Sequence, residues 1–266
     1  MPELPEVEIA ARQLRAWTAG RSIVSFELLD PRLLKEPDAL PALAGARFGV
    51  VTRRGKYLIL PTDRADLVLH FRMTGKVVPD RASQYSRLRI GLDDGLKLAF
   101  EDARRLGELR VLPPGAAPTL PALAAMGPEP WPERQSGGWW AARFVSARGP
   151  IKPALLDQSR VAGLGNIAAS ELLFRARISP VRPTSSLSAA EWERLGEAAH
   201  SFLHDTVNAE EGGEVMYLNQ GGAENPFAVY GREGELCPRC KAPILRFVQA
   251  GRSTFACSSC QRGVID

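Results

Sequence analysis

The stretch 237-CPRCKAPILRFVQAGRSTFACSSC-260 contains every cysteine of this 266-residue chain. Its two CxxC pairs are separated by sixteen residues, which is the spacing of a four-thiolate zinc site between two knuckles. Two disulfides are the alternative, and the acidic N-terminus disfavours them because it is unlike a secretory signal. Since four thiolates close the coordination shell of the metal, the spacing predicts one structural zinc ion on Cys237, Cys240, Cys257 and Cys260.

The residues before this finger predict a mainly helical domain. The segment SLSAAEWERL has Ser188 and Glu191 spaced as a capping box, and apolar residues follow at helical spacing. Further upstream, residues 151–177 (IKPALLDQSRVAGLGNIAASELLFRAR) predict two helices joined by glycine-bearing turns, with Asn166 as the N-cap of the second. Such a helix N-terminus can offer backbone N–H groups to an anion, although the spacing alone favours an ordinary interhelical turn.

Short β-rich runs predict a β-sandwich over residues 22–112. The runs are SIVSFEL, ARFGVVTRR, KYLILPT, ADLVLHFRM, RLRIGL, LKLAF and ELRVL. Between two of them lies Asp94-Gly95, which is a strong hairpin signal. One helix precedes the runs, so we expect an α+β protein whose N-terminal β-sandwich carries a leading helix and whose C-terminal domain is helical.

Composition marks the expected domain boundaries. Residues 114–136 are rich in proline, glycine and alanine and predict a linker between a sandwich domain at 1–113 and a helical domain at 137–227. Within the latter, residues 212–227 are polar and glycine-rich, which predicts a mobile loop, and the stretch is too long for a simple connector. Residues 228–266 form the predicted zinc finger.

Overall composition is that of a globular protein. Apolar residues make up 45% and charged residues 24% of the chain, and no apolar run approaches the roughly 18 residues of a membrane span. We therefore expect a cytoplasmic protein. The net charge is +4 and the cations are mostly arginine, which suits phosphate oxygens; an arginine-rich codon usage is the alternative explanation.

The first eight residues, MPELPEVE, contain the start of a helix, preceded by two residues, Pro2 and Glu3, that the helix does not explain. Pro5 and the glutamates after it suit the first turn of a helix. Pro2 and Glu3 precede that helix and contribute nothing obvious to it. Because a small second residue allows removal of Met1, Pro2 would become a free secondary amine, which is a candidate nucleophile.

Six motifs in order along the chain resemble the formamidopyrimidine-DNA glycosylase family. They are MPELPEVE, RRGKY at 53–57, HFRMTG at 70–75, DARRLG at 102–107, the IKP…GLGNI segment and the final GRSTFACSSCQ. The resemblance covers nearly the whole chain. The related endonuclease VIII group shares the layout, but its members usually have glycine after the glutamate, where this chain has Leu4.

The resemblance implies a helix-two-turn-helix in the second domain and a bifunctional glycosylase and abasic-site lyase that removes oxidised purines, 8-oxoguanine and formamidopyrimidines. It implies that Pro2 attacks C1′ and forms a Schiff base, with Glu3 as proton donor. It further implies that Lys56 contacts phosphates and assists β-elimination, and that Arg252 assists δ-elimination and holds the backbone.

The resemblance also implies the DNA contacts. Arg104, Met73 and Leu106 would fill the gap left by an extruded base, Arg148, Lys152 and Asn166 would hold phosphates, and Tyr85 occupies a position where the family often has histidine. The partner is damaged or abasic double-stranded DNA, the chain is expected to be a monomer, and residues 212–227 would close over the flipped base.

Besides the loop and Tyr85, this chain departs from the family pattern at two further places. Leu106 replaces the usual phenylalanine wedge, and the residue after Ile167 is alanine rather than tyrosine. Base preference is therefore less determined than the chemistry. An oxidised-pyrimidine glycosylase of endonuclease VIII type and a binding module without catalysis are the rival hypotheses, and retention of Pro2, Glu3, Lys56 and Arg252 disfavours the binding module.

Overall fold

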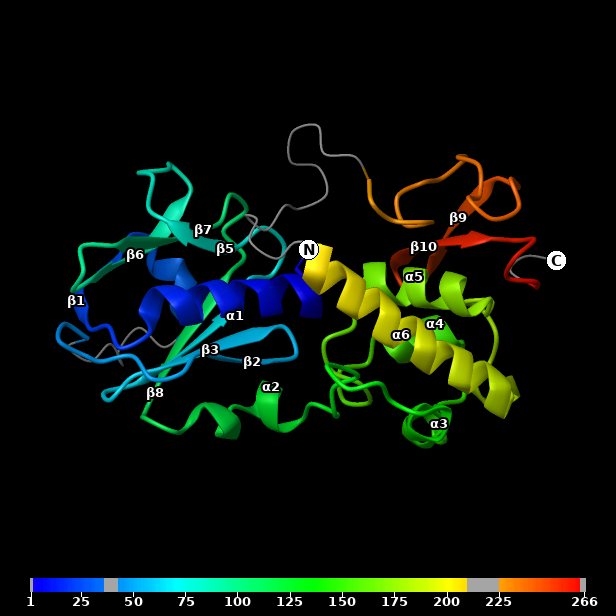
Figure 1. Cartoon of the computed structure of the whole chain (residues 1–266), viewed down its shortest axis with the longest axis horizontal. Helices are drawn as coiled ribbons and strands as arrows, with labels where there is room; N and C mark the ends of the chain where they lie inside the picture. Colours follow the sequence, from blue (N-terminus) through cyan, green and yellow to red (C-terminus); the bar gives the residue numbers. More distant parts are fainter. Residues whose placement is uncertain (1, 36–42, 210–224, 264–266) are drawn as a thin grey trace. The chain divides into compact units, whose positions relative to one another are not determined.

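A computed structural model describes residues 2–35, 43–209 and 225–263 (Figure 1). Its described part divides into two compact units, the first ending at Ala125 and the second beginning at Met126. The division lies inside the stretch predicted as a linker, which carries the 3-10 helix η3 (Ala117–Thr119) and the short helix α2 (Pro121–Ala124). None of the described helices is long and apolar enough to cross a membrane.

Helix α1 (Leu4–Thr18) opens the first unit. Glu3 is its N-cap, and the capping box is completed by Glu6, whose side chain accepts a hydrogen bond from the Glu3 backbone N–H at 2.8 Å. This reciprocal pair satisfies two of the donors that a helix start leaves without partners. The apolar face buries Val7 and Leu14 against the sheets.

Two four-stranded antiparallel sheets form the expected sandwich. One has the order β1-β6-β7-β5 and the other the order β2-β3-β4-β8. The strands are β1 (Ile23–Leu28), β2 (Thr52–Arg54), β3 (Tyr57–Pro61), β4 (Asp66–His70), β5 (Lys76–Pro79), β6 (Ser86–Leu92), β7 (Lys97–Glu101) and β8 (Glu108–Leu112), with the 3-10 helix η1 (Pro31–Leu33) after β1. The predicted hairpin joins β6 to β7, where Gly95 has a φ of 89°.

Two strands differ from the sequence prediction. The run ARFGVVTRR forms only the three-residue strand β2, and Phe48 makes an isolated bridge to Thr62. Strand β5 has four residues, ends in Pro79 and pairs only with β7 at the edge of its sheet. An edge strand tolerates proline because one row of its backbone groups is unpaired. With only four residues, one of them proline, β5 shows little of the pattern by which strands are predicted.

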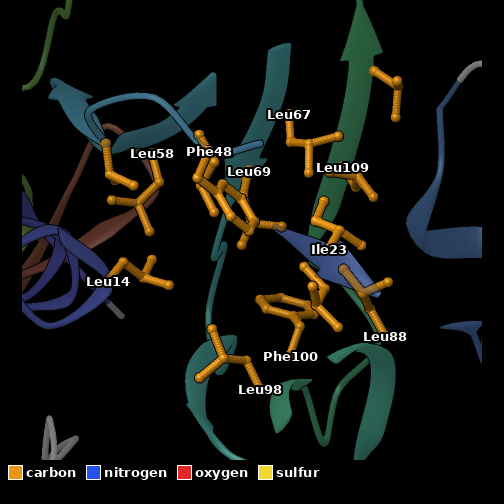
Figure 2. Packing of buried hydrophobic residues seen from close by; sticks show 14 of the residues in the cluster. Leu14, Ile23, Phe48, Leu58, Leu67, Leu69, Leu88, Leu98, Phe100 and Leu109 are labelled. Carbon is orange, nitrogen blue, oxygen red and sulfur yellow. The ribbon is translucent and has the colours of Figure 1, made fainter. Parts of the chain in front are cut away.

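The core of the first unit lies between the two sheets and α1. Leu14 from α1, Leu58 from β3 and Phe100 from β7 converge there and are almost fully buried (Figure 2). Each buried side chain of this size contributes about 1.5–3 kcal/mol relative to exposure. Packing of this kind fixes α1 against the strands and thereby places the residues at its N-terminus.

The second unit is mainly helical, as predicted. It contains α3 (Gly137–Phe144), α4 (Ile151–Leu155), α5 (Asn166–Ala176), the 3-10 helix η4 (Thr184–Ser186) and α6 (Ala189–Ala209). A stack of Trp140, Phe144 and Trp192 joins α3 to α6, with ring centroids 6.4 and 5.4 Å apart. The predicted capping box is present, because Glu191 accepts from the Ser188 N–H at 2.9 Å and donates its own N–H to the serine hydroxyl.

The N-cap prediction for α5 is wrong by one residue. Gly165 is the N-cap in an extended conformation, and Asn166 is the first helical residue. The Asn166 side chain instead bonds to Lys152 and to the Ser253 carbonyl. Ser253 belongs to the hairpin of β9 (Ile244–Gln249) and β10 (Arg252–Cys257), which packs against α5.

Candidate functional site

Pro2 and Glu3 lie at the N-terminus of α1 and both are buried. The carboxylate of Glu3 accepts a hydrogen bond from the N3 backbone N–H of the helix. That bond and the burial of Glu3, which is 2% exposed, hold the carboxylate at the first turn of α1. The pair therefore places an acid beside a residue that carries a secondary amine once Met1 is removed.

Lys56 lies in the two-residue turn between β2 and β3. The preceding Gly55 has a φ of 56°, and a glycine at the first position of such a turn suits the twist of an antiparallel hairpin. Helix α1 contacts both β2 and β3. The turn that presents Lys56 and the helix that presents Pro2 and Glu3 are thus packed within one unit.

The side chains predicted to probe the base stack lie on the loops that join the strands of the same unit. Met73 follows β4 and is 37% exposed, and Leu106 precedes β8 and is 42% exposed. Arg104 is exposed on the same loop as Leu106. Tyr85 precedes β6 and is 44% exposed. Their exposure leaves these side chains accessible to a ligand.

One buried carboxylate organises these loops. Asp102 accepts hydrogen bonds from the N–H groups of Leu106 and Gly107, both at 2.7 Å, through one oxygen. Through the other oxygen it accepts from the hydroxyl of Thr74 and from the N–H of Arg104 at 3.1 Å. Thr74 follows Met73, so Asp102 ties the two loops that carry the predicted wedges to each other.

His70 ends β4 and stays neutral near physiological pH. Burial, and then the charge of Arg72, lower the pKa of His70 from 6.5 to about 4. Its Nδ1 accepts the backbone N–H of Arg72 at 3.0 Å, and its ring meets the Tyr57 ring edge-on at 4.4 Å. Through these contacts His70 shapes the turn before Met73.

Lys152 lies in the interior of the second unit and is 1% exposed. Its ammonium donates to Asn166 Oδ1 at 2.7 Å, to the Ser253 carbonyl at 2.9 Å and to Thr254 Oγ1 at 2.8 Å. Asn166 Nδ2 donates to the same carbonyl at 2.9 Å. The predicted phosphate ligands Lys152 and Asn166 are therefore brought together, and both are bonded to the zinc-finger hairpin.

Arg148 and Arg252 are exposed in the second unit. Arg148 lies between α3 and α4, and Arg252 follows the hairpin turn of Ala250 and Gly251, whose φ values are 47° and 73°. Positive φ at both turn positions is typical of a tight hairpin. Neither guanidinium has an ion-pair partner within residues 2–35, 43–209 and 225–263, so each is available to an external anion.

The four cysteines form a closed metal site. Their sulfur atoms lie within 4.8 Å of one another, at 3.9 Å between Cys237 and Cys260 and at 3.4 Å between Cys240 and Cys257. Zn–S bonds of about 2.3 Å in a tetrahedron require sulfurs about 3.8 Å apart. The thiols are free, so the disulfide alternative is wrong and the site holds one structural zinc ion.

Sequence reasoning did not find the organising roles of the buried carboxylates of Asp102 and Glu171. Glu171 is 1% exposed on α5 and accepts the backbone N–H groups of Ala228 at 3.0 Å and of Val229 and Tyr230 at 2.9 Å. It thereby holds the chain that follows the predicted capping loop, of which residues 212–224 lie outside the described residues. The available signal was a glutamate followed directly by the apolar residues Leu172, Leu173 and Phe174.

Comparison with known proteins matches this chain in three segments. The family descriptions are formamidopyrimidine-DNA glycosylase N-terminal domain for residues 1–109, formamidopyrimidine-DNA glycosylase H2TH domain for residues 126–217, and zinc finger found in FPG and IleRS for residues 234–263. H2TH is the helix-two-turn-helix expected above.

Relatives match over the full length. Formamidopyrimidine-DNA glycosylases of Paracoccus denitrificans and Geobacillus kaustophilus are each 38% identical, covering 98% of this chain and 100% of theirs. The crystal structure of MutM (Fpg) from Thermus thermophilus superposes with a TM-score of 0.84 at 37% identity, covering 98% of both chains. The Lactococcus lactis enzyme in complex with Fapy-dG DNA superposes with a TM-score of 0.85 at 32% identity, covering 98% of this chain and 100% of that one.

Proposed function

This chain belongs to the formamidopyrimidine-DNA glycosylase family, and we propose that it removes oxidised purines from duplex DNA and then cleaves the strand, with Pro2 as nucleophile. Solved relatives are bound to DNA containing carbocyclic 8-oxoguanine, Fapy-dG or an abasic site. The observation that carries the proposal is the buried Pro2–Glu3 pair at the start of α1. We expect the enzyme to act on the nucleoid in the cytoplasm, because its substrate is DNA.

The first step uses the amine that removal of Met1 exposes. An α-amine has a reference pKa near 8, so an appreciable fraction is neutral at pH 7. The Pro2 nitrogen forms a bond to C1′ as the bond from C1′ to the damaged base breaks, and Glu3 supplies a proton to the ring oxygen or to the leaving base. Opening of the sugar ring then leaves a Schiff base on Pro2.

Strand cleavage follows from that imine. Loss of a C2′ proton and departure of the 3′ phosphate is the β-elimination that Lys56 assists from its turn. Loss of the C4′ proton from the resulting conjugated imine, with departure of the 5′ phosphate, is the δ-elimination that Arg252 assists from the tip of the zinc-finger hairpin. The tight turn before Arg252 and the zinc-stiffened hairpin support that role, because they fix the backbone from which the exposed side chain extends.

Base extrusion precedes this chemistry. Met73, Arg104 and Leu106 enter the space that the extruded base leaves, and Tyr85 contacts the strand beside them. Flipping a base costs a few kcal/mol, and filling the gap offsets part of that cost. The exposure of these side chains and the fixed loops around Asp102 support the assignment.

The second unit binds the phosphates of the DNA backbone. Arg148 and Asn166 supply a guanidinium and an amide at the helix-two-turn-helix. Lys152 is buried, so we assign it to holding Asn166 and the hairpin in place rather than to direct phosphate contact. The zinc site supports the base of the same hairpin through Cys257, the last residue of β10.

Borohydride trapping tests the proposal. The protein is incubated with duplexes that carry 8-oxoguanine, an oxidised pyrimidine, an abasic site or no lesion, reduced, and digested for peptide mass analysis. We expect a sugar adduct on Pro2 with the purine lesion and the abasic site. Blocking Met1 removal should abolish trapping while DNA binding survives, and an adduct on Lys56 with Pro2 unmodified would refute the assignment.

The same panel separates the rival functions. Preferential trapping on the oxidised pyrimidine would indicate an enzyme of endonuclease VIII type, and binding without any adduct would indicate a non-catalytic module. Glu3→Gln serves as the internal control, because it leaves the amine intact but removes the proton donor. It should stop base removal and still allow cleavage at a pre-formed abasic site.

A further inference from the structure

A buried ion pair joins α1 to the hairpin that carries Lys56. Glu8 on α1 and Arg53 on β2 have side chains only 9% and 5% exposed, and Arg53 Nε donates to Glu8 Oε2 at 2.9 Å. Glu8 lies five residues after Glu3, which is about 7.5 Å along the helix axis. The pair therefore connects the helix that presents Pro2 and Glu3 to the strand that leads into the Lys56 turn.

The second donor of Arg53 reaches the turn itself. Arg53 Nη1 donates to the Gly55 carbonyl at 3.0 Å, and that carbonyl belongs to the peptide bond whose nitrogen is that of Lys56. A planar guanidinium can hold two acceptors in a fixed relation, which the single ammonium of a lysine does less well. Arg53 thus fixes the position of the peptide bond between Gly55 and Lys56 relative to the Glu8 carboxylate.

Neighbouring contacts keep Glu8 charged and in place. Burial opposes ionisation, but the hydrogen bonds and charges of Arg53 and Arg15 outweigh it and lower the pKa of the Glu8 carboxyl below its usual value. Arg15 Nη1 lies 3.2 Å from Glu8 Oε1, and Arg15 Nε donates to the Val51 carbonyl at 2.7 Å just before β2. A second arginine therefore ties α1 to the same hairpin.

We propose that Glu8 and Arg53 are positioning residues that hold Lys56 in register with the N-terminus of α1 for strand cleavage. The idea rests on the proposed role of Lys56 in elimination. A buried charge pair is not needed for stability alone, because well-packed apolar residues often replace such pairs without loss. What apolar residues cannot supply is the directed bond to the Gly55 carbonyl.

The test distinguishes an effect on the position of Lys56 from an effect on the stability of the fold. Glu8→Leu/Arg53→Met removes both charges together and should keep a folded protein. Arg53→Lys keeps the charge opposite Glu8 but loses the two-pronged contact, and it serves if the double variant does not fold. Leu98→Val, in the opposite sheet and buried, is the matched control for core destabilisation without a change at the turn.

Single-turnover assays on a duplex with a pre-formed abasic site measure two steps. Borohydride trapping measures imine formation on Pro2, and strand cleavage measures elimination. We expect the double variant and Arg53→Lys to form the imine within about twofold of wild type and to cleave about tenfold to a hundredfold more slowly, since a 1 Å misplacement can cost that much. Leu98→Val should behave as wild type in both steps.

A double-mutant cycle with Lys56→Met completes the test. If Arg53 acts through Lys56, adding Arg53→Lys to Lys56→Met should change cleavage by less than about twofold, because the two effects are not independent. Wild-type cleavage in Glu8→Leu/Arg53→Met, with Lys56→Met slow, would overturn the positioning role alone. Wild-type cleavage in Lys56→Met would overturn the proposed function of Lys56 and this inference with it.

Discussion

Replacing Lys152 with methionine tests how the second unit binds phosphates. Methionine keeps most of the volume of the lysine side chain and removes only the ammonium. That ammonium makes three hydrogen bonds inside the protein and is 1% exposed. If Lys152 acts by holding Asn166 and the hairpin, its loss should weaken the structure first and DNA binding as a consequence.

The hydrogen bonds of the Lys152 ammonium set the size of the expected loss of folding stability. The Ser253 carbonyl keeps the Asn166 amide as a donor, whereas Asn166 Oδ1 and Thr254 Oγ1 each lose the donor from Lys152. Asn166 is half-buried and can turn to solvent, and the Thr254 hydroxyl keeps its hydrogen bond to Gln249 Oε1 at 3.3 Å. An unsatisfied buried acceptor costs about 1–3 kcal/mol, and here we expect a total loss in that range. For a unit of this size that lowers the Tm by about 5–10 °C.

Thermal unfolding and a salt titration of DNA binding measure the two effects, with Arg148→Ala as the matched control. Each phosphate contact contributes about 0.9 to the slope of log K against log salt. Arg148→Ala should lower that slope by about one and leave the Tm unchanged, because its side chain is exposed. Lys152→Met should lower the Tm and leave the slope unchanged; a lower slope with an unchanged Tm would refute the reasoning.

Three further predictions follow from other parts of the molecule. Leu106→Phe should tighten binding to lesion duplex more than to undamaged duplex, since stacking on a base contributes about 1–3 kcal/mol; equal effects in a binding titration would show that position 106 does not probe the stack. Cys237→Ser should release the zinc and abolish DNA binding, and elemental analysis beside a binding assay checks both; full binding by a metal-free protein would contradict it. The pKa of His70 is depressed to about 4 in the folded protein, so on acidification the unfolded chain binds the proton at a higher pH than the folded protein does. The stability that neutral His70 contributes is therefore complete above about pH 6.5 and is lost as the pH falls toward 4. This loss amounts to at most about 3 kcal/mol, at 1.36 kcal/mol per pKa unit, and His70→Gln should flatten this part of the stability profile in denaturant titrations.

Local patterns in the sequence were sufficient for much of the fold. The capping box of α6 and the hairpin at Gly95 both depend on residues a few positions apart. Such signals can be recognised without knowing which distant residues pack against them. The zinc ligands were equally local, as two CxxC pairs. Strand β5 was missed because an edge strand of four residues ending in Pro79 carries too little pattern.

Contacts between residues far apart in the chain could be known only from the tertiary structure. The sequence by itself determined the family, the sandwich and helical domains and the zinc ligands, because periodicity, caps and motif spacing are local properties. Only the fold decided that Lys152 is buried against β10, that Asp102 joins the Met73 and Leu106 loops, and that Arg53 spans Glu8 and Gly55. The physical reason is that a charged side chain in a sequence carries no sign of its burial, which is set by the partners that folding brings to it.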